Sequence, residues 1–351
     1  MTVVDNKTVI FKKIPTGMPV PGEHLVVENR PFDLDAAPPA GGVIVEILSL
    51  SLDPYLRFRM REPHIESYTP AYQLGAAADN DTISRVLRAD GASPYAAGDL
   101  LYAYLPFAEY AALSAEQAAK ATKLDNPFGL APEMFLGPLG MPGLTAYSSL
   151  HQIGHLKKGE TIFISSAAGA VGQVAGQIAK REGLTVIGSV GSDEKLDFVI
   201  NESGFDGAFN YKKERPWDAL KRLAPNGLDI YFENVGGEHL EAAIENLNVH
   251  GRIIVCGFIS SYNKPLEERY GVRNIQEFFA KRLSMAGFLV FDEEFGPAWT
   301  EEHQRKVQQW IADGSFPAKL HITHGIDNGP KSLVEIFEGK NFGKAVLKVK
   351  E

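Results

Sequence analysis

The stretch from Ser165 to Lys180, SSAAGAVGQVAGQIAK, decides the fold. It follows a short apolar run at Thr161–Ser165 and continues into a helical pattern that extends to Arg181. A strand, a tight turn of small residues and a helix are the setting that a dinucleotide fingerprint requires. The turn itself is AAGAVG, in which Ala167 stands where the first glycine of GxGxxG usually stands. This imperfect AxGxxG motif favours a nucleotide-binding turn over a plain helix–strand contact between small residues.

Each glycine of this turn is expected to have its own physical role. Gly169 lets the backbone approach a pyrophosphate, and Gly172 permits close packing of the helix on the strand. The amides at the start of the helix meet the phosphate charge. We therefore expect the dinucleotide to bind along the whole turn, which consists of Ala168, Gly169, Ala170, Val171 and Gly172.

From about residue 140 onward, short β-branched runs alternate with helical patterns. Strands are expected at 161–165, 185–190, 207–211, 228–235, 251–257 and 284–290. Helices are expected between them, including one at 193–201 and one that Pro216 opens. This alternation is typical of βαβ units around a parallel sheet. The sequence thus predicts the α/β class, with a Rossmann-type, doubly wound, parallel six-stranded sheet.

The first 130 residues have a different character. Pro, Gly and Asp interrupt short apolar runs such as Val43–Leu48 and Leu100–Tyr104, which predicts a β-rich unit. The tail from about residue 313 returns to strand character and is expected to fold back on this unit. The predicted domains are therefore a substrate domain of residues 1–130 and 313–351, and a nucleotide-binding domain of residues 131–312.

The composition of the chain excludes several classes of function. Its 351 residues include 35 Lys and Arg against 44 Asp and Glu, a formal net charge of −9. Nucleic-acid binding needs clustered cations, so this balance argues against it. No apolar run reaches the roughly 18 residues of a membrane helix, and the amino terminus lacks the apolar segment of a secretory signal. We therefore expect a soluble cytoplasmic protein with neither a nucleic-acid nor a membrane partner.

The potential metal ligands are few. Cys256 is the single cysteine, so neither an intramolecular disulfide nor a Cys-rich zinc site is expected. The nine histidines show neither HExxH nor another tight ligand spacing. His151 and His155 stand four residues apart, but Gly154 between them argues against a shared helix face. An ordinary helix end is the favoured interpretation, and no metal is expected.

The end of the second predicted strand indicates which dinucleotide binds. An NAD enzyme usually has Asp or Glu there, about 20 residues after the fingerprint. Here the strand ends in Gly188–Ser192 with no acid, while Asp193 and Glu194 fall in the next helix's first turn, where acids are common. Lys195 follows as a cation that can reach a 2′-phosphate, with Ser192 as a hydroxyl donor. The alternative for Lys195 is a solvated surface lysine, but the missing acid favours NADP(H).

Seven motifs in order resemble a known family: LSLDPYLR (Leu50–Arg57), GMPGLTAY (Gly140–Tyr147), the fingerprint stretch, GSDEK (Gly191–Lys195), FNYK (Phe209–Lys212), ENVGG (Glu233–Gly237) and CGFISSYN (Cys256–Asn263). Together they are similar to the zinc-independent medium-chain dehydrogenase/reductases that include prostaglandin/leukotriene reductases, plant alkenal double-bond reductases and bacterial curcumin reductase. The resemblance covers nearly the whole chain. It departs at Leu74–Leu87, which leaves the substrate more open than the reaction.

The resemblance implies a GroES-like first domain, NADP(H) as cofactor and a homodimer. It implies that Lys195 holds the 2′-phosphate, that Tyr211 lies beside the adenosine and that Asn234 bonds along the cofactor. Asn341 would close over the cofactor. The nicotinamide would be lined by Cys256, Gly257, Phe258, Ile259, Ser260, Phe288, Leu289 and Val290. Core packing for the aromatic residues and a turn for Asn234 are the structural alternatives.

Two tyrosines are the candidate catalytic residues. Tyr262 follows the predicted strand at 251–257, at the end where doubly wound sheets bind ligands, and Tyr55 follows Asp53 and Pro54 in the first domain. Hydride addition to the β-carbon of an enone develops negative charge on the carbonyl oxygen. A neutral phenol stabilises that charge by donating a hydrogen bond. For both residues the alternative is a ring that only packs.

The expected reaction is NADPH-dependent reduction of the C=C bond of α,β-unsaturated ketones or aldehydes, with protonation at the α-carbon. Aromatic residues are frequent in the first domain, which favours a small apolar or aromatic substrate. An NADPH:quinone oxidoreductase is the alternative enzyme. A cofactor-binding protein with a structural or regulatory use is the alternative outside catalysis.

Overall fold

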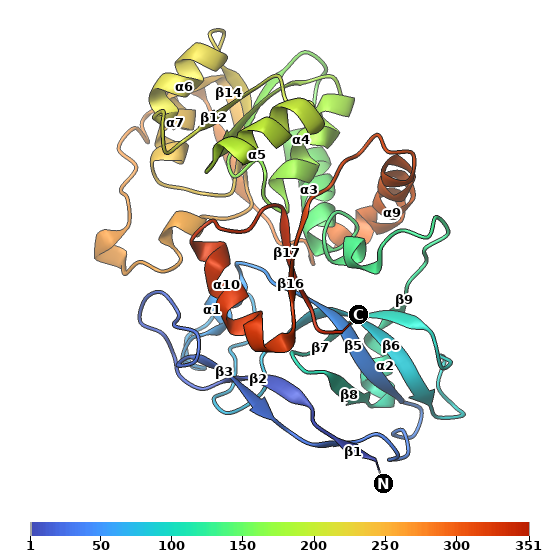
Figure 1. Cartoon of the computed structure of the whole chain (residues 1–351). Helices are drawn as coiled ribbons and strands as arrows, with labels where there is room; N and C mark the ends of the chain where they lie inside the picture. The colour runs from blue at the N-terminus through green and yellow to red at the C-terminus, as the bar shows by residue number, and fades with distance from the viewer. Residues whose placement is uncertain (1, 351) are drawn as a thin grey trace. The chain divides into compact units, whose positions relative to one another are not determined.

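The computed structural model describes residues 2–350, which form two compact units. The first unit comprises the described residues up to Leu136, together with Leu320–Asn341 and the chain from Ala345 on. The second unit comprises Gly137–Lys319 and Phe342–Lys344. Figure 1 shows the course of the chain through both. No helix among residues 2–350 is long and apolar enough to cross a membrane.

The second unit contains the predicted parallel sheet. Its six strands lie in the order β12–β11–β10–β13–β14–β15, and every neighbouring pair is parallel. The chain therefore runs outward from β10 in both directions, which confirms the doubly wound Rossmann sheet. The strands are β10 (Thr161–Ile164), β11 (Thr185–Val190), β12 (Gly207–Asn210), β13 (Leu228–Glu233), β14 (Leu247–Val255) and β15 (Ser284–Gly287).

Helices alternate with these strands as the sequence pattern predicts. Pro216 occupies the first turn of its helix, where its missing N–H costs no bond. The helix expected at 193–201 is shorter, because a π-helical turn replaces its second half at Phe198–Glu202. The helices are α3 (Met141–Ser149), α4 (Gly172–Arg181), α5 (Asp193–Asp197), α6 (Pro216–Leu223), α7 (Glu238–Asn246), α8 (Glu277–Lys281) and α9 (Gly296–Ala312).

The core of the second unit is formed by the central strands. Phe163 of β10 stacks on Tyr231 of β13 with ring centroids 5.0 Å apart, and both side chains are fully buried. Tyr231 and Phe232 point to opposite faces of the sheet, yet neither is exposed, as expected where helices cover both faces. This rigid centre fixes the carboxyl ends of β10, β13 and β14.

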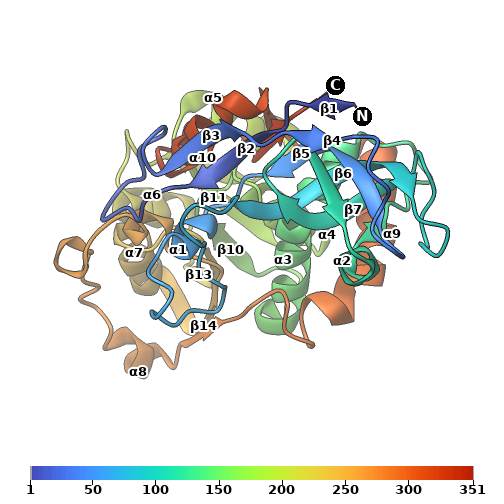
Figure 2. The ribbon, with the colours of Figure 1, turned by 90° about the horizontal axis from the view of Figure 1, so that it is seen from below.

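The first unit is rich in β-structure, as expected. Its main sheet has the order β16–β17–β5–β6–β7–β9, with β8 also paired to β5. Figure 2 shows β5, β6 and β7 together. The strands of this sheet are β5 (Val43–Ser51), β6 (Asp79–Ala89), β7 (Leu100–Pro106), β8 (Tyr110–Leu113), β9 (Thr122–Lys123), β16 (Leu320–His324) and β17 (Lys344–Lys348).

The smaller elements complete this unit. Two strand pairs lie outside the main sheet, β1 (Val3–Val4) with β4 (Phe32–Asp33) and β2 (Lys7–Phe11) with β3 (Leu25–Asn29). The carboxyl-terminal tail returns as a strand, since β17 pairs antiparallel with β5. The helices are α1 (Leu56–Arg59), α2 (Ala115–Lys120) and α10 (Gly329–Phe337), the last of which lies in the tail where only strand was expected.

Candidate functional site

The turn between β10 and α4 accepts only small residues. A Cβ on Gly172 would lie 2.3 Å from the carbonyl oxygen of Ser166 and 2.9 Å from the Cα of Ala167. A Cβ on Gly169 would lie 3.0 Å from the same carbonyl oxygen. Among residues 2–350, no side chain caps the start of α4, and such a helix end attracts phosphate. The turn therefore has the shape and the polarity that a pyrophosphate requires.

A segment from near the end of the chain completes this turn. The Gly343 amide donates to the Ala168 carbonyl at 3.0 Å, and Gly343 forms a parallel bridge with Gly169. A Cβ on Gly343 would lie 2.0 Å from the Lys319 carbonyl oxygen, and its φ is 76°, so only glycine fits there. Asn341, expected to close over the cofactor, is half-buried and precedes this bridge by two residues.

Ser192 and Lys195 lie where β11 leads into α5. The Ser192 hydroxyl accepts a hydrogen bond from the Lys195 amide at 3.3 Å and so caps the helix. The Lys195 side chain is half-buried, and this burial, together with the nearby charge of Lys212, lowers its pKa. An anion bound between two close cations relieves their repulsion, so this corner suits a phosphate.

Tyr211 follows β12 and packs against the end of β11. Its hydroxyl would lie 3.0 Å from a Cβ on Gly191, so that glycine makes room for the phenol. The ring meets His239 edge-on, with centroids 5.5 Å apart and planes at 78°. The side chain is still 41% exposed, which leaves part of the ring accessible for stacking.

Glu233 ends β13 and connects two loops of the site. Its carboxyl group is fully buried, and Oε1 accepts hydrogen bonds from the amides of Val235 at 2.6 Å and Gly236 at 2.8 Å. Burial raises the pKa of this carboxyl group to about 7. Its backbone carbonyl accepts from the amides of Cys256 and Gly257 at 2.9 and 3.0 Å. Sequence reasoning missed this role, because most glutamates are exposed and no spacing distinguishes this one.

Asn234 is fixed between the ends of β10 and β13. Its backbone amide donates to the Ser165 hydroxyl at 2.9 Å, and its side-chain amide donates to the Ser165 carbonyl at 2.8 Å. Parallel sheets of this kind bind ligands outside the carboxyl ends of their strands. The structure thus places Asn234 at the expected edge, with Ser165 as a partner that sequence reasoning did not select.

The loop after β14 contains Cys256–Ser260 and is bonded to the loop after β13. The amide of Ile259 donates to the Asn234 carbonyl at 3.1 Å, and Ser260 is bonded to Val235 in the same way. Burial raises the pKa of the Cys256 thiol to about 12, so the thiol is neutral at ordinary pH. The two loops therefore form one hydrogen-bonded surface.

Tyr262 folds back over this surface. Its hydroxyl oxygen accepts a hydrogen bond from the Phe258 amide at 3.2 Å, and it would lie 2.5 Å from a Cβ on Gly257. The missing side chain of Gly257 therefore makes room for the phenol. In this bond the Tyr262 oxygen is the acceptor and the Phe258 amide is the donor. The hydroxyl hydrogen of Tyr262 is therefore not used by this bond.

Phe288, Leu289 and Val290 follow β15 in a tight turn. Phe288 stacks on Phe295 with centroids 5.0 Å apart, and the Leu289 amide donates to Asp292 Oδ2 at 3.2 Å. Val290 is 8% exposed and its carbonyl accepts from Gly296 at 2.8 Å. Contacts within the turn therefore bury most of Val290, while Phe288 and Leu289 remain half-buried.

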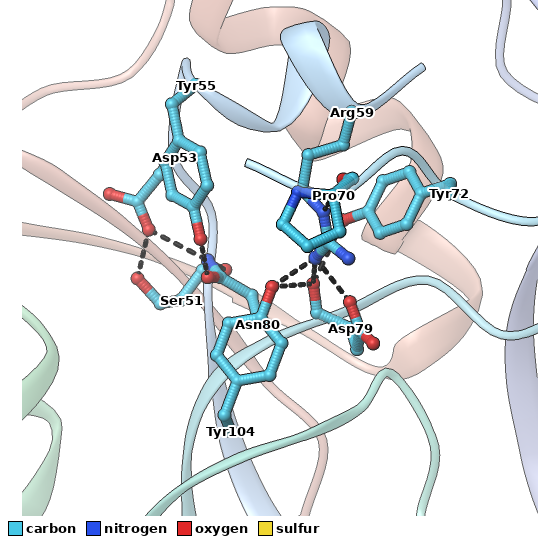
Figure 3. Close-up of polar contacts among 9 residues, drawn as sticks. All are labelled: Ser51, Asp53, Tyr55, Arg59, Pro70, Tyr72, Asp79, Asn80 and Tyr104. Atoms are coloured by element: carbon cyan, nitrogen blue, oxygen red, sulfur yellow. Dashed lines mark hydrogen bonds and ion pairs between the residues drawn. The ribbon is translucent and has the colours of Figure 1, made fainter. Parts of the chain in front are cut away.

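Tyr55 belongs to the first unit and lies just before α1 (Figure 3). Its hydroxyl donates to Asn80 Oδ1 at 2.5 Å. The Asn80 amide nitrogen donates in turn to the Ser51 carbonyl at 2.9 Å and to Asp53 Oδ2 at 3.0 Å. Burial raises the pKa of Tyr55 strongly, so this residue is a neutral phenol.

Arg59 holds the neighbouring part of the same cluster (Figure 3). Its buried guanidinium pairs with Asp79, donates to the Tyr104 hydroxyl and donates to the Pro70 carbonyl at 3.1 Å. It also lies 4.1 Å from the centre of the Tyr72 ring, a cation–π contact. These contacts anchor the segment between Pro70 and Asp79, part of the region where the family resemblance is weakest. Asn80 and Arg59 carried no motif that singled them out.

The histidines that stand four apart serve packing. His151 stacks on Trp299 with centroids 4.8 Å apart and meets the edge of Tyr147, and burial lowers its pKa. His155 ends the helical segment with φ 43°. Among residues 2–350, no group of three or more His, Cys, Asp or Glu side chains is placed to hold a metal ion.

Two family models match the chain. The one described as zinc-binding dehydrogenase matches residues 170–303, and the one described as N-terminal domain of oxidoreductase matches residues 7–121. The chain is 48% identical over 344 residues to the NADP-dependent oxidoreductase RED1 of Cochliobolus heterostrophus, a match that covers 98% of this chain and 97% of the relative. It is 41% identical over 352 residues to the NADP(+)-dependent 2-alkenal reductase of Nicotiana tabacum, covering 99% and 98%.

A solved structure extends the likeness to three dimensions. CurA from Vibrio vulnificus, in complex with NADPH, superposes with a TM-score of 0.89 at 32% identity, over 98% of this chain and 99% of that one. Identity above 40% over nearly the whole length accompanies the fingerprint turn, the sheet order and the acid-free end of β11. The chain belongs to the zinc-independent medium-chain dehydrogenase/reductases, as a member of their NADPH-dependent double-bond reductases.

Proposed function

We propose that the protein reduces the C=C bond of α,β-unsaturated ketones or aldehydes. Bound NADPH supplies the hydride that adds to the β-carbon, and the α-carbon takes a proton from solvent or a hydroxyl group. The names of two relatives, an NADP-dependent oxidoreductase and a 2-alkenal reductase, support this reaction class. The observation that carries the proposal is the Tyr262 phenol, held at the strand ends with its acceptor side bonded to the Phe258 amide.

The residues of the second unit fit the cofactor that the family uses. The glycines of the fingerprint turn exclude any Cβ and leave backbone for the pyrophosphate. We propose that the 2′-phosphate lies at Ser192 and Lys195 and that the adenosine lies at Tyr211. The remaining proposed contacts in this unit are Ala168, Gly169, Ala170, Val171, Gly172, Asn234, Cys256, Gly257, Phe258, Ile259, Ser260, Phe288, Leu289 and Val290. Asn341, which belongs to the first unit, is proposed as a further contact.

Tyr262 is proposed as the residue that stabilises the enolate. When hydride reaches the β-carbon, the carbonyl oxygen of the substrate gains negative charge, and the Tyr262 hydroxyl donates a hydrogen bond to it. The Phe258 amide donates to the phenol oxygen, which holds that oxygen in place before the substrate arrives. Tyr55 is proposed as the second catalytic phenol of the substrate site, with a smaller contribution.

We also propose a homodimer in the cytoplasm. Strand β15 forms one edge of the six-stranded sheet, and its flanking residues Phe279 and Phe291 are 89% and 70% exposed. An edge strand with apolar neighbours is a natural pairing site for a second copy. The single cysteine suits a reducing compartment, because the fold needs no disulfide. Analytical ultracentrifugation tests the dimer, and a monomer at micromolar concentration would contradict it.

The decisive experiment is NADPH oxidation against a panel of enones, enals and quinones, with product analysis. We expect turnover of apolar or aromatic enones and enals to the saturated carbonyl compounds. Preferential turnover of quinones would identify a quinone oxidoreductase instead. Tight NADPH binding without turnover of any member would indicate a binding protein without catalysis.

A further inference from the structure

Helix α4 binds a later segment of its own unit through side chains on one of its faces. Gln173, Gln177 and Arg181 stand four residues apart, so they lie on one side of the helix. The Gln177 amide donates to the Pro317 carbonyl at 2.9 Å. The Arg181 guanidinium donates to the Ser315 carbonyl at 2.9 Å. The chain around Pro317 is therefore attached to α4, although 140 and 134 positions separate these two bonded pairs in the sequence.

Gln173 joins the same segment through both ends of its side-chain amide. Its Nε2 donates to the Lys319 carbonyl at 3.1 Å, and its Oε1 accepts from the Lys319 amide at 2.8 Å. One bond needs the nitrogen and the other needs the oxygen, so the amide has a single orientation. Gln173 is fully buried, and a polar group that loses its partners at this depth is costly. The pairing therefore fixes the position of Lys319 against the start of α4.

The Lys319 backbone connects this pair to the fingerprint turn. Its carbonyl oxygen also accepts a hydrogen bond from the Lys344 amide at 3.1 Å. The neighbouring Gly343 passes so close that a Cβ there would lie 2.0 Å from the same oxygen. The Gly343 amide donates to the Ala168 carbonyl at 3.0 Å, and Gly343 forms a bridge with Gly169. The position of Lys319 therefore decides where the Gly343 amide meets the turn.

These contacts form a closed ring that begins and ends on the turn. Gln173 is the second residue of α4, and its backbone amide donates to the Gly169 carbonyl at 3.2 Å. From its side chain the ring continues through Lys319 and Gly343 back to Ala168. Every member belongs to the second unit. A turn that is held from both sides keeps its backbone amides in one arrangement before a ligand arrives, which lowers the cost of binding.

We propose that Gln173 is a positioning residue for cofactor binding, whose side-chain amide holds the fingerprint turn, through Lys319 and Gly343, in the form that accepts the pyrophosphate of NADPH. This inference rests on the proposed function, in which the pyrophosphate lies on this turn. Gln173 acts through the turn, because both polar atoms of its side chain are bonded to Lys319. Without these bonds, only a fraction of the molecules would have the turn in its binding form, and the apparent affinity would fall by that fraction.

The test separates the pyrophosphate from the rest of the cofactor by comparing NADPH with adenosine 2′-monophosphate. The second ligand has the adenosine and the 2′-phosphate, proposed to lie at Tyr211 and Lys195, but it has no pyrophosphate. Isothermal titration calorimetry measures the Kd of both ligands for the wild type, Gln173→Met and Gln177→Met. Methionine is similar to glutamine in size and lacks the amide that forms the hydrogen bonds. Hydrogen exchange of residues 166–172 in the ligand-free proteins reports on the turn itself.

Gln177→Met is the matched control. Gln177 is 5% exposed on the same helix, and its amide donates to the Pro317 carbonyl instead of to Lys319. Urea unfolding of the ligand-free proteins measures the stability that each substitution costs. Gln173→Glu is the second variant if Gln173→Met does not fold, since it keeps the acceptor for the Lys319 amide and replaces only the donor.

Gln173→Met should raise the Kd of NADPH by about 5- to 30-fold, within the range that two neutral hydrogen bonds contribute, and leave the Kd of adenosine 2′-monophosphate within about 2-fold of the wild type. Exchange at residues 166–172 should become faster in this variant. Gln177→Met should keep both Kd values and the exchange rate close to those of the wild type, even where its stability falls.

Three results would overturn the inference: an unchanged NADPH Kd in Gln173→Met, an equal loss of affinity for the two ligands, or the same loss of NADPH affinity in Gln177→Met. Each of these leaves the proposed function intact, because the wild type would still bind NADPH and reduce enones. Failure of the proposed function has different signatures, either NADPH binding by the wild type without turnover of any enone, or no NADPH binding at all. The second of these would also refute the inference.

Discussion

The hydroxyl oxygen of Tyr262 accepts a hydrogen bond from the backbone amide of Phe258 at 3.2 Å. Phe258 belongs to the loop that Glu233 and Asn234 hold against the ends of the central strands. The phenol is thereby attached to the rigid part of the second unit, although Tyr262 itself lies in an irregular segment. A donor fixed in advance is the kind of group that stabilises developing charge without reorganisation.

Replacement of Tyr262 by phenylalanine tests this role directly. The ring remains and only the hydroxyl is lost. Loss of an isolated oxyanion donor typically costs about 10²–10³ in turnover. We expect a smaller fall in kcat with a good enone, roughly 10–100-fold, on the expectation that a ribose hydroxyl of the bound cofactor would share the charge. NADPH affinity and melting temperature should change little. If the Tyr262→Phe variant turns over the enone at the wild-type rate, Tyr262 is only a packing residue.

Lys195→Ala should weaken NADPH binding by ~1.5–3 kcal/mol, the contribution of a charge-assisted hydrogen bond, and leave NADH binding nearly unchanged. Fluorescence titration with both cofactors measures this difference. Lys213→Ala is the control, because Lys213 is an exposed neighbour that pairs with Asp193 at 2.5 Å. Equal affinity of the wild type for the two cofactors would refute the assignment of Lys195 to the 2′-phosphate.

Gly172→Ala should destabilise the fingerprint turn, because the added Cβ would lie 2.3 Å from the backbone oxygen of Ser166. Overpacking of this kind costs about 1–3 kcal/mol, and the displaced turn should also lose most of its NADPH affinity. Gly271→Ala is the control, since nothing lies within 4 Å of its added Cβ. Urea unfolding measures the loss of stability, and cofactor titration measures the loss of affinity. Wild-type stability and NADPH affinity in Gly172→Ala would show that the turn has room for a Cβ at this position.

Glu233 should make the stability of the protein depend on pH. Its pKa is raised from 4.5 to about 7 in the folded state by burial, so the folded state holds this proton more tightly than the unfolded state. The resulting stabilisation is complete below the unfolded pKa and is lost as the pH rises through about 7, by up to about 3 kcal/mol. Glu233→Gln should flatten that part of the profile, measured by urea unfolding between about pH 5 and about pH 8. An identical slope in wild type and variant would exclude Glu233 as its source.

Chelation tests the absence of a catalytic metal. With one cysteine in the chain, and no cluster of potential ligands among residues 2–350, enone reduction should survive exhaustive treatment with a chelator. Elemental analysis should find no stoichiometric zinc. Activity that is lost on chelation and restored by zinc would contradict the family assignment.

The regular part of the fold could be predicted from the sequence. The strand at Thr185–Val190 and the helix that begins at Pro216 agree with the pattern, because hydrophobic period and helix-start signals act locally. The predicted strand at 251–257 is displaced, since β14 begins at Leu247 and ends at Val255. Helix α10 was missed because the tail between two strands was expected to contain strand alone. Element ends depend on tertiary bonds, such as those from Cys256 and Gly257 to Glu233.

The candidate site was predictable only where a motif signals it. The fingerprint glycines have a role that their spacing indicates, whereas Asn80, Arg59 and Glu233 act through partners that the fold brings together. Asn80 bonds to Ser51 across two strands, and Arg59 reaches Pro70 in a loop. Buried polar groups take their partners from the three-dimensional arrangement, so a single sequence carries little trace of them.

The bond between Gly343 and Ala168 has a consequence for the order of folding. The two residues are 175 positions apart, since 343 − 168 = 175, so the fingerprint turn obtains one of its hydrogen bonds from a residue far along the chain. Contacts of such long separation form late, because the entropy of closing the loop opposes them. The strands and helices on either side of the turn have neighbours much nearer in the sequence, so we expect them to form before this long-range bond does.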